Sequence, residues 1–218
     1  MENTFPRRSP LIAPELEQQL MQLFARITEP VALTCILDEG EKSQEMAGLI
    51  NHLADLCDKI SCRFLAPGED PELDGVLDAR LLPAAGIGSA DAAPRMIFHG
   101  VPGGREMTSF ASAVLTAGGG AKPLDKYTLK DIARIRRPMQ LQICVSLGCH
   151  HCAQLVMASQ RVAYENPLVT AHMIDANLYP SLVEKYAIAR VPLLIVDGDR
   201  QYPGGKSMGE LTSLLYKI

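Results

Sequence analysis

Two cysteines separated by two residues are the strongest candidates for chemistry in this sequence. They lie in the motif Gly148-Cys149-His150-His151-Cys152, directly after the apolar segment 139–146, which we predict to be a strand. We expect a turn at Leu147-Gly148 and a helix that starts at Cys149. The unpaired N–H groups and positive dipole end of a helix N-terminus stabilise a thiolate, the reactive form of cysteine. The motif therefore predicts thiol–disulfide exchange.

The spacing also gives the two thiols different roles. Cys149 is expected to attack a substrate disulfide, and Cys152, three residues later on the same helical face, is expected to resolve the mixed disulfide. His150 and His151 lie between them, and their imidazoles, when cationic, would lower the thiol pKa further. We assign both histidines to the substrate-binding part of the site.

Metal binding is an alternative for the motif, because cysteine and histidine are also zinc ligands. Four consecutive residues cannot easily surround a metal ion, and structural zinc sites usually take a second pair of ligands from elsewhere in the chain. The sequence holds no second CxxC and no HxxxH or HxxxC pair. We therefore predict no metal site and keep a metal carrier as the less favoured alternative.

The elements that must position the motif occur twice along the chain. Each copy is predicted to be a strand, a helix and a strand, over 31–37, 42–59 and 60–66 in the first copy and over 139–146, 150–165 and 168–175 in the second. The prolines that precede the first strand of each copy, Pro30 and Pro138, give an offset of 138 − 30 = 108 residues. Strands that alternate with helices in this way predict parallel βαβ units.

The ends of the two copies also resemble each other. The segment from Pro94 to Gly100 parallels the segment from Pro192 to Gly198, since in each a proline opens a strand that closes on glycine. Residues 101–107 parallel 202–208, and each segment precedes a helix. We therefore predict two tandem α/β domains of one fold, over residues 1–120 and 121–218, with central mixed sheets flanked by helices.

Only the second domain carries the cysteine pair. At the offset of 108, Glu41 and Gln44 stand where the second copy has Cys149 and Cys152, so the first domain is not expected to exchange disulfides. Unpaired cysteine usually behaves as a small buried hydrophobe. We therefore expect the lone cysteines of the first domain, Cys35, Cys57 and Cys62, to be core residues, and Cys144 stands alone in the apolar segment 139–146.

Composition restricts the partners and the compartment. The 218 residues carry 21 Lys+Arg against 25 Asp+Glu, a formal net charge of −4, which argues against nucleic acid as the main partner. No apolar run approaches the ~18 residues of a membrane-spanning helix, and the N-terminus lacks the apolar core of a signal peptide. We therefore expect a cytoplasmic protein that is not associated with a membrane.

Several phrases in the sequence resemble one known family. PVALTCILDEGEKSQEM, GGREMTSFASAVLTAGG, SLGCHHC and VPLLIVDG are similar to the N-terminal domain of the flavoprotein subunit of bacterial alkyl hydroperoxide reductase. In that family two thioredoxin folds follow one another, and only the second carries a Cys-His-x-Cys motif. The resemblance covers essentially the whole chain and implies two tandem thioredoxin/glutaredoxin-like folds. The sequence departs from the family at Ala153, where proline is usual.

The resemblance also implies roles for individual residues. Cys149 and Cys152 match the family's redox pair, and Glu106 matches a glutamate of the first fold thought to assist proton transfer at the dithiol. Without the resemblance, Glu106 is simply an acidic residue at a helix start, where the dipole favours it. Val191-Pro192 matches the cis-proline position of thioredoxin-like folds, where the residue before the proline hydrogen-bonds a bound peptide. We expect the Val191–Pro192 bond to be cis, which is otherwise uncommon.

In that family the domain carries electrons from a flavin and NADH module to the disulfide of a peroxiredoxin. We therefore expect a thiol–disulfide oxidoreductase that relays electrons from a separate or formerly fused flavoprotein reductase to a peroxiredoxin or another protein disulfide. The Cys149–Cys152 disulfide would be its redox group, with no bound cofactor, because no flavin domain follows Ile218. The alternative from another class is a redox sensor in which the first domain docks a partner.

Overall fold

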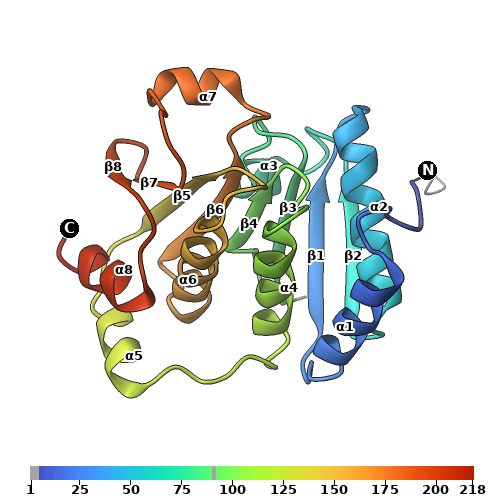
Figure 1. Cartoon of the computed structure of the whole chain (residues 1–218), viewed down its shortest axis with the longest axis horizontal. Helices are drawn as coiled ribbons and strands as arrows, with labels where there is room; N and C mark the ends of the chain where they lie inside the picture. Colours follow the sequence, from blue (N-terminus) through green and yellow to red (C-terminus); the bar gives the residue numbers. More distant parts are fainter. Residues whose placement is uncertain (1–4, 90–91) are drawn as a thin grey trace.

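The structure is a computed structural model that describes residues 5–89 and 92–218. Residues 1–4, where the first predicted domain begins, and residues 90–91, within the same domain, lie outside the described residues. The described ranges contain a repeated series of strands and helices, coloured from blue to red along the chain in Figure 1.

The same order of elements occurs in the two halves of the chain. The first half contains α1 (Pro14–Phe24), β1 (Val31–Ile36), α2 (Glu41–Asp55), β2 (Ile60–Leu65), α3 (Pro71–Val76), β3 (Ala84–Gly88), β4 (Met96–His99) and α4 (Glu106–Ala117). The second half contains α5 (Lys126–Ile132), β5 (Met139–Val145), α6 (Cys152–Glu165), β6 (Val169–Asp175), α7 (Pro180–Lys185), β7 (Leu193–Val196), β8 (Arg200–Pro203) and α8 (Met208–Leu215). The predicted order of β-α-β, two strands and a helix is present in both halves, with a short extra helix after each βαβ unit.

The strands of the two halves join into one mixed sheet, in the order β2-β1-β3-β4-β6-β5-β7-β8. In each half the strands of the βαβ unit are parallel, and the next strand, β3 or β7, is antiparallel to the first. The seam between the halves is the parallel pair β4–β6, where Met96 lies opposite Ala171. The predicted α/β class with a mixed sheet and flanking helices is confirmed. The sequence pattern did not predict that the strands of both halves form one continuous sheet. The boundary at residues 120–121 falls between α4 and α5 and stays a prediction.

Buried side chains fill both faces of the sheet. Helices α4 and α6 lie side by side across one face of the sheet (Figure 1). Residues of both helices belong to the largest apolar cluster. That cluster contains residues of both halves and includes Phe98 and Phe110, whose ring centroids are 4.9 Å apart. Two smaller clusters lie on the opposite face of the sheet. They contain the alternate strand residues that point to that face, such as Ile97 and Cys144. The side-by-side packing of α4 and α6 brings the first half into contact with the helix that follows the cysteine motif.

One part of the predicted repeat is wrong. The prediction aligned the strand after Pro94 with the strand after Pro192, that is, β4 with β7. In the sheet β7 corresponds to β3, because β3 is antiparallel to β1 as β7 is antiparallel to β5. The matching proline is Pro83, which also follows a cis peptide bond, and 192 − 83 = 109 agrees with the offset of 108. The strand Ala84–Gly88 was not predicted, because four of its five residues are Ala or Gly and only Ile87 has a β-branched side chain typical of strands.

Candidate functional site

The cysteine pair lies where β5 ends and α6 begins. A turn over residues 146–151 connects the two elements, and the first residue of α6 is Cys152. Cys149 and Cys152 are joined by a disulfide, with their Cα atoms 5.5 Å apart. The disulfide that the spacing predicts is therefore present.

The predicted start of the helix at Cys149 is wrong by three residues. The backbone N–H of Cys149 donates to Ser146 O over 2.9 Å, which closes a tight turn through Leu147 and Gly148. The chain makes a further turn before the helix, so His151 is the N-cap residue of α6. Cys152 therefore begins the helix, and Cys149 lies in the turn just ahead of it.

The two cysteines differ in their exposure to solvent. Cys149 is half-buried, whereas Cys152 is 0% exposed. Cys149 Sγ lies 4.0 Å from the carbonyl oxygen of Val191, and the Val191–Pro192 bond is cis, as predicted. A protein in solution can therefore reach Cys149 next to a backbone carbonyl group, but it cannot reach Cys152 without a rearrangement.

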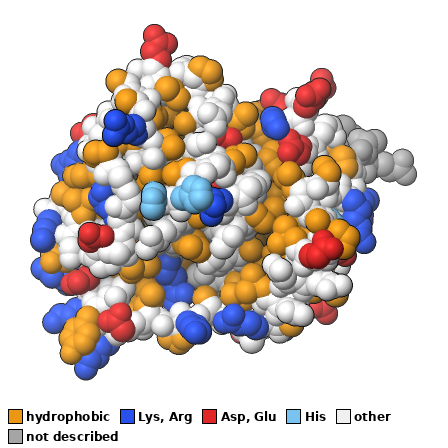
Figure 2. Space-filling model, in the orientation of Figure 1, with side chains coloured by type: hydrophobic (Ala, Val, Ile, Leu, Met, Phe, Trp, Pro, Cys, Tyr) orange, Lys and Arg blue, Asp and Glu red, His pale blue; other side chains and the backbone are white. Residues whose placement is uncertain are grey.

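Both histidines of the motif, His150 and His151, are exposed in the turn. Figure 2 shows histidine side chains next to a Lys or Arg side chain on this face of the molecule. The other three histidines of the chain are buried. The exposure of His150 and His151 fits the predicted place in a binding surface, and their binding role stays a prediction.

The first half of the chain reaches this edge through the loop before α4. The backbone N–H of Arg105 donates to Leu147 O over 3.2 Å, and the Arg105 guanidinium lies 3.4 Å from His150 Nε2. Gly104 allows this approach, because its φ is +55° and a Cβ there would lie 2.8 Å from Leu147 O. Arg105 was not among the predicted site residues, although its place directly before Glu106 in the GGREMTSF phrase was a usable signal.

Glu106 is the first residue of α4 and is 0% exposed. Helices α4 and α6 both begin at the edge of the sheet that holds the turn 146–151, so Glu106 and Cys152 share that edge. Burial raises the pKa of Glu106 to about 7, and the negative charge of Asp175 also raises this pKa, against a lowering by the Ser109 hydroxyl. The acidic residue that the sequence places at a helix start is therefore a buried group that titrates near neutral pH.

The hydrogen bonds of Glu106 can be satisfied in both of its protonation states. Its Oε2 is bonded to Ser109 Oγ, which also lies 2.8 Å from the backbone oxygen of Glu106. In the carboxylate form Ser109 Oγ–H donates to Glu106 Oε2, which lowers the pKa, and in the acid form Oε2–H can donate to Ser109 while Ser109 donates to the backbone oxygen. The other oxygen, Oε1, is buried without a hydrogen-bond partner among the described residues. Glu106 can therefore hold a proton at neutral pH and release it at slightly higher pH.

A groove with a volume of about 460 Å³ runs beside the cysteine pair. Ser146 and Val191 line the end near Cys149, and Val183 and Ile188 supply apolar side chains farther along. Since Val191 contributes the carbonyl oxygen next to Cys149 Sγ, an extended segment in this groove would lie against the exposed sulfur. The arrangement can therefore hold a peptide that carries a disulfide.

The corresponding position in the first half is already occupied. Leu82 precedes the cis peptide bond to Pro83, as Val191 precedes Pro192. The carbonyl oxygen of Leu82 accepts a hydrogen bond from the hydroxyl of Tyr179, a buried residue of the second half, over 3.1 Å. The first half thus has neither a cysteine pair nor a free carbonyl at this place, which supports the prediction that it does not exchange disulfides.

The other four cysteines are free thiols. Cys35 and Cys144 are fully buried, and burial raises the pKa of the Cys144 thiol to about 12. Cys57 and Cys62 are half-buried and pack against the largest apolar cluster. The prediction that the cysteines of the first domain are core residues is therefore confirmed for Cys35, whereas Cys57 and Cys62 lie at the edge of the core.

Two features that other functions would need are missing from the described part of the chain. Within residues 5–89 and 92–218, no group of three or more His, Cys, Asp or Glu side chains is placed to hold a metal ion. In the same ranges no helix has both the length and the apolar character needed to cross a membrane. The metal-carrier alternative thus lacks a complete set of ligands among the described residues.

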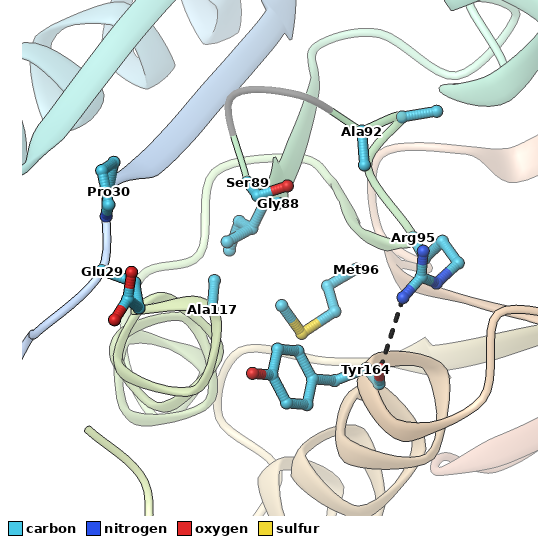
Figure 3. Close-up of a pocket in the computed structure, with 11 residues that line it drawn as sticks. Glu29, Pro30, Gly88, Ser89, Ala92, Arg95, Met96, Ala117 and Tyr164 are labelled. Atoms are coloured by element: carbon cyan, nitrogen blue, oxygen red, sulfur yellow. Dashed lines mark hydrogen bonds between the residues drawn. The ribbon is translucent and has the colours of Figure 1, made fainter. Parts of the chain in front are cut away.

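A separate hollow of about 520 Å³ lies at the opposite edge of the sheet, where β1 and β4 begin (Figure 3). Arg95 lines it and donates to the carbonyl oxygens of Ala163 and Tyr164 over 3.0 and 3.3 Å. These hydrogen bonds satisfy carbonyl oxygens in the last turn of α6, where the helix dipole favours a cation. Because Arg95 is engaged in this way and the lining residues include no cysteine, we assign the hollow no part in the redox site.

Comparison with known proteins identifies two kinds of similarity. Residues 139–215 match the family model described as a thioredoxin domain. The chain is 29% identical over 184 residues to the AhpF subunit of alkyl hydroperoxide reductase from Pseudomonas aeruginosa, an alignment that covers 84% of this chain and 33% of that protein. The chain therefore spans about a third of the length of this curated relative.

Solved structures share the fold over nearly the whole chain. The NTD_N/C domain of alkyl hydroperoxide reductase AhpF from Enterococcus faecalis has a TM-score of 0.88 and 32% identity, over 93% of this chain and 99% of that one. A protein disulfide oxidoreductase from Aeropyrum pernix has a TM-score of 0.84 at 14% identity, over 94% and 92% of the two chains. The second likeness shows the fold alone, and together they confirm the predicted thioredoxin-like architecture.

Proposed function

The chain belongs to the family of the N-terminal domain of the alkyl hydroperoxide reductase AhpF, and we propose that it passes electrons through Cys149 and Cys152 to the disulfide of a peroxiredoxin. Family membership and the closed cysteine pair make it a thiol–disulfide oxidoreductase. The peroxiredoxin acceptor, a flavoprotein reductase as electron donor and a cytoplasmic location are parts of the proposal.

In the proposed cycle the Cys149 thiolate attacks one sulfur of the acceptor disulfide, and the second acceptor sulfur leaves as a thiolate. Cys152 then attacks Cys149 Sγ, which releases the reduced acceptor and closes the Cys149–Cys152 disulfide. Two electrons pass to the acceptor, and the flavoprotein donor returns two electrons to the chain. The observation that supports this assignment of roles is the unequal exposure of the sulfurs, since Cys149 is half-buried and Cys152 is 0% exposed.

The acceptor segment is proposed to lie extended in the groove beside Cys149. Its backbone N–H would donate to the carbonyl oxygen of Val191, which Pro192 holds 4.0 Å from Cys149 Sγ. His150 and His151 would contact the acceptor on the other side of the sulfur, because both are exposed in the motif turn. These contacts would align the acceptor disulfide for attack.

Glu106 is proposed to accept the proton of the Cys152 thiol during the second step. Because the pKa of Glu106 is about 7, the carboxylate form becomes available only as the pH rises through 7. The rate of resolution should therefore rise with pH across this range, and Glu106→Gln should lower it about 100-fold at pH 8 and remove the rise, as expected for loss of a general base. Single-turnover oxidation of the pre-reduced protein by a model disulfide, measured between pH 5.5 and 8.5, checks this.

Glu41→Gln provides the matched control, because Glu41 is an exposed acidic residue at the start of α2. This variant should keep the wild-type pH profile. An unchanged profile in Glu106→Gln would contradict the proposed proton transfer without affecting the roles of the two cysteines.

The acceptor is tested by mixing the pre-reduced protein with an equal amount of an oxidised peroxiredoxin. Thiol labelling should show that two thiols are lost from the chain for every two gained by the peroxiredoxin, within seconds. Insulin serves as the control disulfide. Reduction of insulin without reduction of the peroxiredoxin would contradict the proposed acceptor, and a stable one-to-one complex without turnover would favour the sensor alternative.

A further inference from the structure

Two arginines approach the cysteine motif from opposite directions along the sheet. Arg105 lies in the loop after β4, and Arg190 lies in the segment before β7. In the strand order β4-β6-β5-β7, the loop after β5, which contains Cys149, comes between those two segments. The loop after β4, the loop after β5 and the segment before β7 lie at the same end of the strands. This is because β4 and β5 are both parallel to β6, whereas β7 is antiparallel to β5. Cys149 therefore lies between the two arginines.

Both arginines are exposed and have their charge available. Arg105 lies 3.4 Å from His150 Nε2, and Arg190 directly precedes Val191, whose carbonyl oxygen is 4.0 Å from Cys149 Sγ. Among the ion pairs of the described residues, none includes Arg105 or Arg190. Figure 2 shows a basic side chain directly beside the exposed histidines. The surroundings of the exposed sulfur thus carry two positive charges without a carboxylate partner in the described part of the chain.

Acidic groups that could offset these charges are few near the motif. Glu106 and Asp175 are buried, and Glu184 is the one acidic residue among those that line the groove. The chain as a whole has a net charge of −4, so the positive charge at the motif does not follow from a basic composition. A guanidinium group binds carboxylates in a fork geometry that fixes their orientation.

We propose that Arg105 and Arg190 bind carboxylates of the partner, so that the preferred acceptor is a protein disulfide flanked by acidic residues on both sides. This inference rests on the proposed function and adds the chemistry by which the acceptor is selected. Charges at the rim of an interface act mainly on the rate of encounter and on the choice of partner. Arg105 belongs to the first half, so the half without a cysteine pair contributes to the specificity of the site.

Three synthetic peptides of one sequence test the proposal, each with an internal disulfide flanked by Glu, by Gln or by Lys. The second-order rate constant for oxidation of the pre-reduced full chain should be about tenfold higher with the Glu peptide than with the Gln peptide, and lowest with the Lys peptide. The ratio should approach one in about 0.5 M salt, where surface charges are screened. Equal rate constants for the three peptides would overturn the proposal.

Variants locate the effect on the two arginines. Arg105→Gln and Arg190→Gln should each lower the Glu-to-Gln peptide ratio about threefold, as expected for one exposed ion pair. Arg136→Gln makes the same charge change at an exposed residue before β5, at the opposite edge of the sheet, and should keep the wild-type ratio. A wild-type ratio in the Arg105→Gln/Arg190→Gln double variant would overturn the assignment.

Because the readout is a ratio of two peptides, a general loss of activity in a variant cannot imitate the result. Equal reduction of all three peptides overturns the charge selection alone and leaves the proposed function standing. No reduction of any peptide by the wild-type chain overturns the proposed function, and the inference with it.

Discussion

Cys149→Ser is expected to lower insulin reduction in the presence of dithiothreitol to the rate of dithiothreitol alone. A serine hydroxyl is not ionised at neutral pH, so the variant has no nucleophile at the position that a partner disulfide can reach. Cys152 cannot replace it, because Cys152 is 0% exposed at the start of α6. Turbidity of precipitating insulin chains measures the rate directly.

Cys57→Ser is the matched control, since Cys57 is a half-buried free thiol of the first half. This variant should reduce insulin at the wild-type rate. Wild-type activity in Cys149→Ser, or a complete loss in Cys57→Ser, would contradict the assignment of the reactive thiol.

Acid is expected to destabilise the protein through a buried pair of histidines at the seam between the halves. His99 of β4 and His172 of β6 stack with centroids 5.3 Å apart, and His99 Nε2 lies 3.0 Å from His172 Nδ1. His99 Nδ1 bonds the carbonyl oxygen of Leu81 over 2.8 Å, so it carries the proton, and Nε2 must accept from His172 Nδ1–H. A second proton on His99 would sit on Nε2 and face the Nδ1–H of His172, and a second proton on His172 would sit on Nε2, which lies 3.4 Å from Gln140 Nε2.

Both rings are therefore neutral in the folded protein. Burial lowers the pKa of His99 to about 4 and that of His172 to about 3. The neighbouring His99 also lowers the pKa of His172. The unfolded histidines have a pKa near 6.5, so below that pH the unfolded state binds protons that the folded state does not, and stability falls with pH. Between pH 7 and pH 5 the pair should lower the free energy of unfolding by about 4 kcal/mol.

Glu106 acts in the opposite direction, because its pKa is raised to about 7 and the folded state loses stability as the pH rises above the unfolded value near 4.5. The histidine contribution is therefore best measured in a Glu106→Gln background, by urea unfolding at pH 5, 6 and 7. There His172→Gln should be less stable at pH 7 and should show about half of the pH dependence. The same slope with and without His172 would contradict the assignment of the acid sensitivity to this pair.

The sequence predicted those features that depend on local pattern. Strand β5, helix α6 and the cysteine pair follow from apolar periodicity and a two-residue spacing that are visible within 139–165. The start of α6 was misplaced by three residues, because a further turn at residues 150–151 follows the predicted turn at Leu147-Gly148, and residue types do not reveal it. The strand Ala84–Gly88 was not recognised, and the wrong strand was aligned with β7 in consequence.

Features that depend on packing between distant segments could not be predicted from spacing. The family resemblance pointed to Glu106, but its burial results from the contact of α4 with α6, and Ser109 and Asp175 act on it only in the folded chain. Arg105 was not predicted as a site residue, because it lies 45 positions before His150 in the sequence and comes close to it only in the folded chain. The pairing of β4 with β6 also joins residues from the two halves, and it creates the histidine pair.

The central claim is that Cys149 forms the bond with the acceptor and Cys152 resolves it. The most direct test is to mix Cys152→Ser with an oxidised acceptor and to map the resulting disulfides by mass spectrometry after thiol blocking. The mixed disulfide should accumulate and should join Cys149 to an acceptor cysteine, because the thiol that would release it is missing. Accumulation of a disulfide to Cys57 or Cys62 instead, or rapid turnover of Cys152→Ser without any trapped species, would contradict the claim.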